Sequence, residues 1–375
     1  MSAGWLRRRF LPGGPLPAPR PATPRASPVP YRRPRFLRGS GSSPAADAAR
    51  RPDARPVRSP ARGRTLPWNA GYAEIINAEK SEFNEDQAAC GKLCIRRYEF
   101  GAEEDQEWLT LCTEEDEVIG RELEASCQVG GCTALVAVSL QGKLYVANAG
   151  DSRALLVRRD EIRPLSSEFT PETERQRIQE LAFVYPELLA GEFTRLEFPR
   201  RLKGDDLGQK VLFRDHHMNG WSYKRVEKSD LKYPLIHGQG RQARLLGTLA
   251  VSRGLGDHQL RVLDTNIQLK PFLLSVPQVT VLDMDQLELQ EDDVVVMATD
   301  GLWDVLSNEQ VARLVQSFLP GNRDDPHRFS ELAQMLIRST QGKEDSPTGQ
   351  GQVSYDDVSV FVIPLHSQGQ GGSGP

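Results

Sequence analysis

The clearest hydrophobic pattern lies in the last third of the chain, where an apolar run is followed directly by a polar turn. Val294–Met297 is short, apolar and rich in valine, which predicts a strand buried on both faces. Asp300 and Gly301 follow two residues later, and Gly301 permits a sharp turn because it has no Cβ. We therefore expect a carboxylate at the end of a core strand. That position suits a hard metal cation, and it equally suits an aspartate that only caps its own turn.

Helical periodicity appears twice after this strand. Ser307 and Gln310 form an S-x-x-Q capping box, and Asp325-Pro326 is expected to cap a second helix. The residues expected to face the core are Val311, Leu314, Val315 and Phe318 in the first helix, and Phe329, Leu332 and Leu336 in the second. Two earlier helices are predicted, a short one over 116–125 and one that starts at Thr170 and Pro171 and turns Ile178 and Leu181 inward.

Alternating and β-branched segments predict further strands. Turn residues separate strands near 132–140, 144–148 and 154–158, which we expect to form an antiparallel meander with Asp151 at a tight turn. Other predicted strands are a pair over 81–97 that turns at Gly91-Lys92, a pair over 273–284 around Pro277, and a final strand over 355–363. Together these elements predict an α+β fold, an antiparallel β body flanked by helices.

Composition divides the chain into three parts. Residues 1–66 hold 15 Arg, no Lys and two Asp, together with half of the 26 prolines, which predicts a disordered Pro/Arg-rich tail. The formal net charge of −4 leaves the rest of the chain strongly acidic, which argues against nucleic acid as a partner. We expect one domain over 67–364, with a long polar insertion over 185–244 that we call the flap, and a disordered tail over 365–375.

Cysteine usage and hydropathy bear on localisation. The five cysteines form no C-x-x-C pair, and no secretory signal is present, so we expect reduced thiols in the cytoplasm, the nucleus or both. No stretch approaches the length of a transmembrane helix. Met1–Leu11 mixes apolar residues with three arginines and is suited to weak contact with an anionic membrane surface.

Acidic residues recur at one kind of position. Glu85-Asp86, Asp151, Asp300 and Asp356 each stand at the start, end or turn of a predicted strand. If these strand ends converge, the carboxylates would hold Mg²⁺ or Mn²⁺, because oxygen ligands favour these ions over zinc. Two such ions would activate a water for in-line attack on phosphorus. No other nucleophile is suggested, since neither a Ser-His-Asp nor a cysteine-based arrangement is evident.

Several motifs, in this order, resemble the metal-dependent (PPM, type-2C) serine/threonine protein phosphatases. They are Asn84-Glu85-Asp86, Gly130–Ala134, Ala149–Arg153, Leu249–Asp257, Ala298–Asp304 and Asp356–Val360, and the resemblance spans about residues 70 to 364. The lead-in Trp68–Glu74 and the flap most resemble the H/J/M branch, closest to its M member. The resemblance implies the β-sandwich of that family, a binuclear Mg²⁺ or Mn²⁺ centre, and hydrolysis of phosphoserine and phosphothreonine by a metal-bound water.

The resemblance also implies a role for each site residue. Asp300 and Asp356 would hold the first metal ion, and Asp151 would help to form a weaker third site. Glu85 would reach the second ion through water, supported by Asp86. Lys80 is the only cation just before this pair, where relatives carry a phosphate-binding Arg, so it is the candidate for that function. The branch implies regulatory phosphoproteins as substrates, small GTPases among them.

One departure from the family pattern is large. The Asp-Gly-His-Gly-Gly segment, whose Asp bridges both metal ions in the family, is absent from the sequence. Only 43 residues separate Asp86 from Gly130, too few for the strand and two long helices expected there. The abrupt Cys112–Asp116 junction suggests a skipped block, as in a splice variant. We therefore expect a fold without one strand and most of one helical hairpin, with apolar residues of one sheet face exposed.

The missing carboxylate leaves two functions open. The first is a metal-dependent phosphatase with weakened metal binding, because two dications would lack the shared anion that offsets their repulsion. The second is a catalytically impaired phosphatase-fold protein that acts as a phosphoprotein-binding module, with the flap as its recognition surface.

Overall fold

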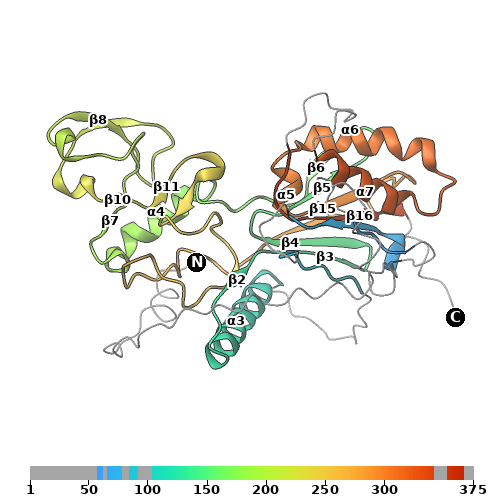
Figure 1. The fold of residues 1–375 in the computed structure, drawn as a ribbon, viewed down its shortest axis with the longest axis horizontal. Coiled ribbons are helices and arrows are strands. Elements are labelled where there is room, and N and C mark those ends of the chain that lie inside the picture. Colours follow the sequence, from blue (N-terminus) through green and yellow to red (C-terminus); the bar gives the residue numbers. More distant parts are fainter. Residues whose placement is uncertain (1–56, 62–65, 78–83, 92–103, 342–352, 367–375) are drawn as a thin grey trace, which may run out of the picture. The chain divides into compact units, whose positions relative to one another are not determined.

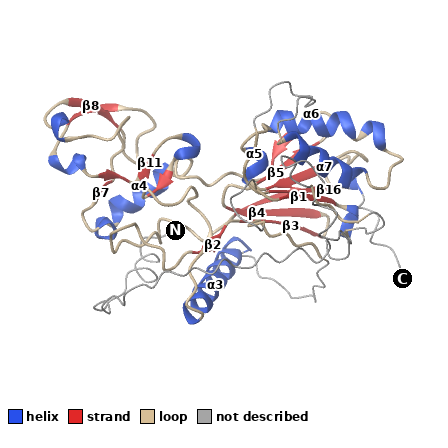
Figure 2. Cartoon of the chain, in the orientation of Figure 1, coloured by secondary structure: helices blue, strands red, loops and turns tan. Residues whose placement is uncertain are grey.

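The computed structural model describes residues 57–61, 66–77, 84–91, 104–341 and 353–366 (Figure 1). These residues fall into two compact units. Unit 1 contains residues 104–134 and 168–277, and unit 2 contains the remaining described residues. Helices and antiparallel sheets occur in both (Figure 2), and the predicted α+β class is confirmed.

The described part of unit 2 is built on a five-stranded antiparallel sheet in the order β1-β16-β15-β5-β6. The strands are β1 (Gly71–Ile75), β16 (Val358–Pro364), β15 (Val294–Ala298), β5 (Arg153–Val157) and β6 (Ile162–Pro164). All five residues of β15 are buried, which confirms the prediction made from its valine run. β1 was not expected from the sequence, and its five residues are also buried.

A three-stranded sheet in the order β14-β4-β3 packs on one face of the larger sheet. It contains β14 (Gln278–Asp283), β4 (Lys143–Ala149) and β3 (Ala134–Leu140). The residues between the sheets include Leu144, Val146 and Leu282 on one side and Tyr72, Leu156, Val295 and Met297 on the other. The predicted meander is therefore wrong at its third strand, because β5 leaves the sheet of β3 and β4 and pairs with β15.

Helices cover the other face of the five-stranded sheet. They are α5 (Asp300–Trp303), α6 (Asn308–Phe318) and α7 (Arg328–Ser339), with the 3-10 turn η7 (Pro320–Asn322) between the last two. Ser307 caps α6, and the predicted box with Gln310 is present. The apolar positions predicted for both helices are buried or partly buried against the sheet. α7 starts two residues later than a cap at Asp325 would place it, because Asp325 closes a turn with the His327 amide before the helix begins.

The outer face of the three-stranded sheet is apolar and open. Val136, Val279 and Val281 keep 51%, 38% and 51% of their surface exposed. Inward-facing neighbours such as Leu144 and Leu282 are almost fully buried. This matches the exposed sheet face expected if a block that covers it in relatives is missing.

Unit 1 begins with α3 (Glu104–Ala125), which is longer than the short helix predicted over 116–125. Asp116 joins it to the short β-pair of β2 (Gly131–Cys132) and β13 (Leu255–Gly256). The carboxylate of Asp116 accepts hydrogen bonds from the Gly256 amide at 2.7 Å and from Lys270 Nζ at 2.5 Å. His258 Nε2 lies 3.1 Å from the same carboxylate.

The rest of unit 1 surrounds α4 (Arg175–Val184) with short elements. Ile178 and Leu181 of α4 face the core as predicted, but the helix starts four residues after Pro171, because Thr170 and Thr173 first close a hydrogen-bonded turn. The short strands are β7 (Phe193–Thr194), β8 (Lys210–Phe213), β9 (Ser222–Arg225), β10 (Tyr233–Pro234), β11 (Ile236–His237) and β12 (Arg244–Leu245). The 3-10 turns of the flap are η3 (Pro186–Leu189), η4 (Gly204–Asp206), η5 (Lys228–Leu231) and η6 (Gly240–Gln242).

Two strand predictions fail. Residues 84–91 form no strand, and the rest of the hairpin predicted over 81–97 lies outside the described residues. Only β14 forms from the pair predicted over 273–284. In the segment before Pro277, the backbone of Leu274 bonds to Ser252 and Gly254, so it pairs with a loop instead of folding back on β14. The two predicted tails also lie largely outside the described residues, and the domain boundaries stay a prediction.

Candidate metal-binding carboxylate site

Asp300 stands where β15 ends and α5 begins, as the sequence predicted. Thr299 fixes this junction to β16: its amide donates to the Ser359 carbonyl at 3.2 Å, and the Ser359 amide donates to its hydroxyl at 3.0 Å. A Cβ at Gly301 would lie 2.1 Å from the Asp357 carbonyl oxygen. Glycine is therefore needed here for close approach of two backbones rather than for the sharp turn expected from the sequence.

Asp86 is brought to the same place by a side-chain contact. The Thr299 hydroxyl donates to Asp86 Oδ2 at 2.8 Å. Burial and the charges of Asp357 and Asp356 outweigh the hydrogen bonds from Thr299 and Ser359 and raise the pKa of Asp86 to about 6. Asp86 therefore holds a proton at a higher pH than an ordinary aspartate does.

Asp357 anchors the segments that precede and contain the Glu-Asp pair. Its buried carboxylate accepts the Asn77 amide at 2.7 Å and the Glu85 amide at 2.8 Å. The side chain of Asn77 donates to the same carboxylate at 3.1 Å. Asp357 is thus a positioning residue, while the neighbouring Asp356 is more exposed and accepts the Asp357 amide at 2.9 Å.

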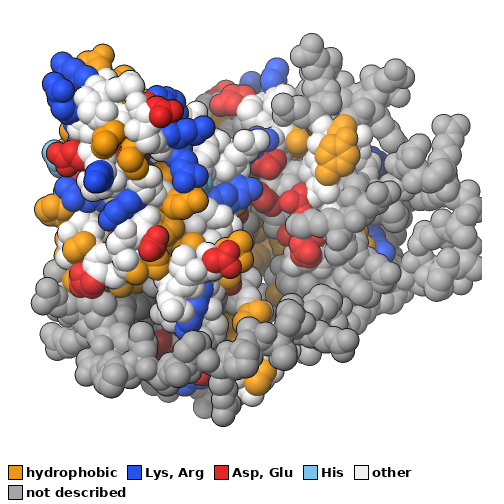
Figure 3. Space-filling view, turned by 60° about the vertical axis from the view of Figure 1, so that its left-hand side comes forward, with side chains coloured by type: hydrophobic (Ala, Val, Ile, Leu, Met, Phe, Trp, Pro, Cys, Tyr) orange, Lys and Arg blue, Asp and Glu red, His pale blue; other side chains and the backbone are white. Residues whose placement is uncertain are grey.

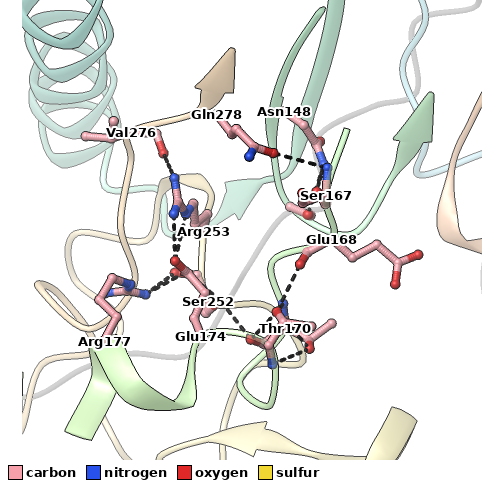
Figure 4. A network of polar contacts seen from close by, with 12 residues as sticks. Asn148, Ser167, Glu168, Thr170, Glu174, Arg177, Ser252, Arg253, Val276 and Gln278 are labelled. Carbon is pink, nitrogen blue, oxygen red and sulfur yellow. Dashed lines mark hydrogen bonds and ion pairs between the residues drawn. The ribbon is translucent and has the colours of Figure 1, made fainter. Parts of the chain in front are cut away.

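Asp151 lies in the connection from β4 to β5, and hydrogen bonds from the Asn148 side chain hold this connection in place. The Asn148 side-chain amide donates to the backbone oxygens of Gly150, Ser152 and Ser167 at 3.2, 2.9 and 2.8 Å. Figure 4 shows the contact of Asn148 with Ser167, and Gln278 accepting from the Ser167 amide. The change of sheet between β4 and β5 therefore carries Asp151 to the end of β15, where β5 pairs with it.

The charges of four neighbouring carboxylates act on Asp300. Burial, together with the charges of Asp151, Asp356, Asp304 and Asp86, raises the pKa of Asp300 to about 7. Carboxylates that raise the pKa of a neighbouring carboxylate in this way are typical of a divalent-cation site.

The carboxylates are near one another without forming a finished ligand set. Within the described part of the chain, no three of them bring their oxygens within 4.8 Å of one another. The group that does so is Asp215, His216 and His217 of the flap. The Asp215 carboxylate is already bound by Arg195 Nε at 3.2 Å and by the His216 amide at 2.8 Å, so this group suits a dication poorly.

The sequence-predicted residues divide into three groups. Asp86, Asp151, Asp300 and Asp356 are brought together. Glu85 is exposed, with only its backbone amide fixed by Asp357. Lys80 lies outside the described residues. Reasoning from sequence missed Asp304 and the positioning roles of Asp357, Thr299 and Asn77; the Asp356-Asp357 doublet was the available signal for one of them.

The comparisons with known proteins identify the family. Residues 78–195 and 209–344 match the family described as "Protein phosphatase 2C". The chain belongs to the protein phosphatase 2C family. It is thus by family a protein serine/threonine phosphatase dependent on Mg²⁺ or Mn²⁺. The oxygen-only carboxylates around Asp300 fit that group of ions.

Individual relatives confirm the predicted branch. The chain is 75% identical to human protein phosphatase 1M over 99% of each chain, and 72% identical to mouse protein phosphatase 1M over 100% of each. It is 38% identical to rat protein phosphatase 1J, over 95% of this chain and 90% of that one. Among solved structures, the serine-threonine phosphatase 2C from Toxoplasma gondii is 18% identical and covers 72% of each chain, with a TM-score of 0.37.

The human alignment also bears on the missing block. Its 456 aligned positions exceed the 375 residues of this chain by 81, so at least that many positions of the human protein have no residue here. This chain is therefore shorter than that relative, and the place of the skipped block at the Cys112–Asp116 junction stays a prediction. A search for membrane spans found no helix of sufficient length and apolar character among the described residues.

Proposed function

We propose that this chain is a phosphatase of the 2C type that binds its metal ions weakly and hydrolyses phosphoserine and phosphothreonine slowly. The observation that carries this proposal is the set of carboxylates around Asp300, present but lacking the bridging aspartate of the family. Burial and the charges of this set raise the pKa of Asp300 to about 7, so a proton competes with a cation for this carboxylate near neutral pH.

Each residue of the site has a distinct part in the proposal. Asp300 and Asp356 would hold one ion, and Asp151 would contribute to a weaker site. A bound Mg²⁺ or Mn²⁺ would supply an activated water and neutralise charge on a phosphoryl group. Asp86, held by the Thr299 hydroxyl, would retain or release a proton near pH 6. Asp357 would keep Glu85 in place through its backbone amide.

The substrates proposed are phosphoproteins, in keeping with the family. Small GTPases are proposed on the branch resemblance alone. A role for Lys80 in binding the substrate phosphate and weak contact of the N-terminal tail with membranes are proposed from the sequence, as is a cytoplasmic or nuclear location.

Hydrolysis of para-nitrophenyl phosphate with added Mn²⁺ tests the catalytic proposal. We expect a measurable rate that needs millimolar Mn²⁺ and is lost in Asp300→Ala. The matched control is Asp292→Ala, a half-buried aspartate at the opposite end of β15 that pairs with Arg323 and Arg328. Equal rates in both variants would show that Asp300 takes no part.

The second candidate, a phosphoprotein-binding module without turnover, is favoured by the missing bridging residue. Calorimetric titration with Mn²⁺ separates the two functions. Saturable binding that disappears in Asp300→Ala supports the enzyme, and no heat of binding at millimolar Mn²⁺ supports the module.

A further inference from the structure

The flap contains a cavity whose charge is opposite to that of the carboxylate site. It has a volume of about 350 Å³ and lies between the start of α4, β7, the segment 197–202, Arg214 and the segment 232–239. Five of its lining side chains are Arg or Lys, and three are Asp or Glu. Figure 3 shows Lys and Arg side chains spread over the left-hand part of the view. The size falls in the range of pockets that bind small ligands.

Part of this positive charge is neutralised by local ion pairs. Arg214 forms a two-pronged pair with Glu197, at 2.5 and 2.8 Å, and Arg175 Nε lies 3.5 Å from the same carboxylate. Arg200 pairs with Asp206, which is not part of the lining, at 2.5 and 2.8 Å. One glutamate is therefore shared between two arginines, and burial together with the charge of Arg214 lowers the pKa of Arg175.

Two cations of the lining are left without a carboxylate. Among the described residues, neither Arg201 nor Lys232 has an ion pair, and Asp230, the acidic residue of the lining closest to Lys232 in sequence, is bound by Lys224 at 2.8 Å. Arg201 stacks on the ring of Tyr233, with 3.9 Å from Cζ to the ring centre. Stacking fixes the plane of the guanidinium and leaves its N–H edge able to donate.

Neutral donors complete the lining. His237 lies in the same lining, and burial together with the charge of Arg201 lowers its pKa, which favours the neutral ring. Thr194 adds a hydroxyl. Unpaired Arg and Lys with neutral donors in a concave site match the requirements of a tetrahedral oxyanion better than those of a cation or an apolar group.

We propose that this flap cavity is a non-catalytic binding site for a phosphate monoester, with Arg201 and Lys232 as its principal ligands. The cavity is larger than a bare phosphate needs, so a phosphorylated side chain with its adjoining backbone fits the volume. The proposal deepens the phosphoprotein recognition proposed above and rests on it for the source of the phosphate group. It requires no turnover at Asp300.

Calorimetry with the full chain in EDTA tests the proposal, because hydrolysis is suppressed. The probes are a neutral hexapeptide with one phosphothreonine, its unphosphorylated form, O-phosphoserine and inorganic phosphate. We expect the phosphopeptide to bind, and Arg201→Gln and Lys232→Gln each to weaken binding by about three- to tenfold, the loss of one partly exposed charge-assisted contact. Lys228→Gln, an exposed cation of the same flap outside the lining, should change affinity less than twofold.

The outcomes separate the sources and the alternatives. Tighter binding of the phosphopeptide than of O-phosphoserine and phosphate supports a protein ligand, while equal binding supports a small phosphate ligand at the same cavity. Arg201→Lys keeps the charge but not the stacked fork and should fall between the parent chain and Arg201→Gln. Equal losses in Lys228→Gln and Lys232→Gln, or binding that ignores phosphorylation, would overturn the proposal.

Hydrolysis of para-nitrophenyl phosphate with Mn²⁺ is measured on the same variants. A chain that binds the phosphopeptide in EDTA but hydrolyses nothing retains the cavity and loses the catalytic proposal. A chain that hydrolyses para-nitrophenyl phosphate but does not bind the phosphopeptide in EDTA supports the catalytic proposal and contradicts the cavity proposal.

Discussion

Asp116 of unit 1 is buried and Asp300 of unit 2 is half-buried, yet their surroundings act on them in opposite ways. Burial would raise the pKa of Asp116, but hydrogen bonds from His258, Lys270 and the Gly256 amide, with the charge of Lys270, outweigh it and lower the pKa to about 2. Around Asp300, burial and neighbouring carboxylates all raise the pKa, to about 7. A carboxylate with cationic and hydrogen-bonding partners stabilises a fold. A carboxylate surrounded by other carboxylates lowers stability and is typical of a binding site.

The Glu174 network of unit 1 supports the same distinction. Glu174 is bound by Arg253 Nη2 at 2.7 Å, by Arg177 at 2.8 Å and by the Ser252 hydroxyl at 2.9 Å (Figure 4). Burial opposes these contacts, but together they lower the pKa of Glu174. Partnered acids of this kind join distant parts of unit 1, here α4 and the loop before β13.

The largest effect is expected from Lys270→Met. Lys270 Nζ lies 2.5 Å from the Asp116 carboxylate and both side chains are buried, so the variant leaves a buried charge without its main partner. We expect the free energy of unfolding to fall by roughly 3–5 kcal/mol. Urea denaturation followed by circular dichroism measures the change. The double variant Asp116→Asn/Lys270→Met should regain much of it; failure to regain any would mean that packing rather than charge is responsible.

The second largest effect is expected from acid, which should remove the stability that the ionised Asp116 contributes. Its folded pKa, about 2, lies below the ordinary value of 3.8, so the stability it supplies is full above pH 4 and is lost as the pH falls toward 2. We expect a loss of about 2 kcal/mol over this window that is absent in Asp116→Asn. Unfolding curves at pH 2.5, 3.5 and 5 measure it, and identical pH slopes in the two proteins would contradict the assignment.

Asp300→Asn should act in the opposite direction. Because the folded pKa of Asp300 is raised to about 7, its ionisation destabilises the fold progressively from about pH 4 to pH 7 and fully above that. In EDTA at pH 8 we expect the variant to be more stable than the parent by about 1–2 kcal/mol, after allowance for its partial exposure. At pH 4 the two should agree. A variant that is less stable at pH 8 would show that Asp300 has a partner.

The smallest effect is expected from Asp151→Asn. It removes the neighbouring charge that raises the pKa of Asp300 most, so the pKa of Asp300 should fall. We expect a gain in the free energy of unfolding below about 1 kcal/mol at pH 8 in EDTA. Carbon-detected NMR titration of the aspartate carboxyls measures the shift. Asp160→Asn, an exposed aspartate of the same unit, is the matched control and should leave the pKa of Asp300 unchanged.

Local sequence signals predicted the elements whose stability is set locally. The valine run of β15 and the Ser307 cap of α6 were sufficient because burial on both faces and capping are encoded within a few residues. The strand-end rule also placed Asp300 and Asp151 in one site. It gave no account of the sheet change between β4 and β5, because partner choice depends on strands more than a hundred residues away.

Long-range contacts explain the other failures. β1 carries Glu74 in its interior, and the Tyr72 hydroxyl donates to that glutamate at 2.8 Å, so a charged residue masked the strand pattern. Asp357 could not be recognised as a positioning residue because its partners Asn77 and Glu85 are more than 270 residues away in sequence. The charge of the flap cavity depends on which of its cations form ion pairs among the described residues and which, like Arg201 and Lys232, do not. No spacing of residues in the sequence predicts this.

The open valine face of the β14-β4-β3 sheet has a consequence for the lifetime of the protein in a cell. An uncovered apolar sheet attracts chaperones and proteases, so the abundance of this form in a cell would be set by its turnover. We expect a shorter half-life in a pulse-chase experiment than for the human 1M relative, and a longer one when Val136, Val279 and Val281 are replaced by threonine.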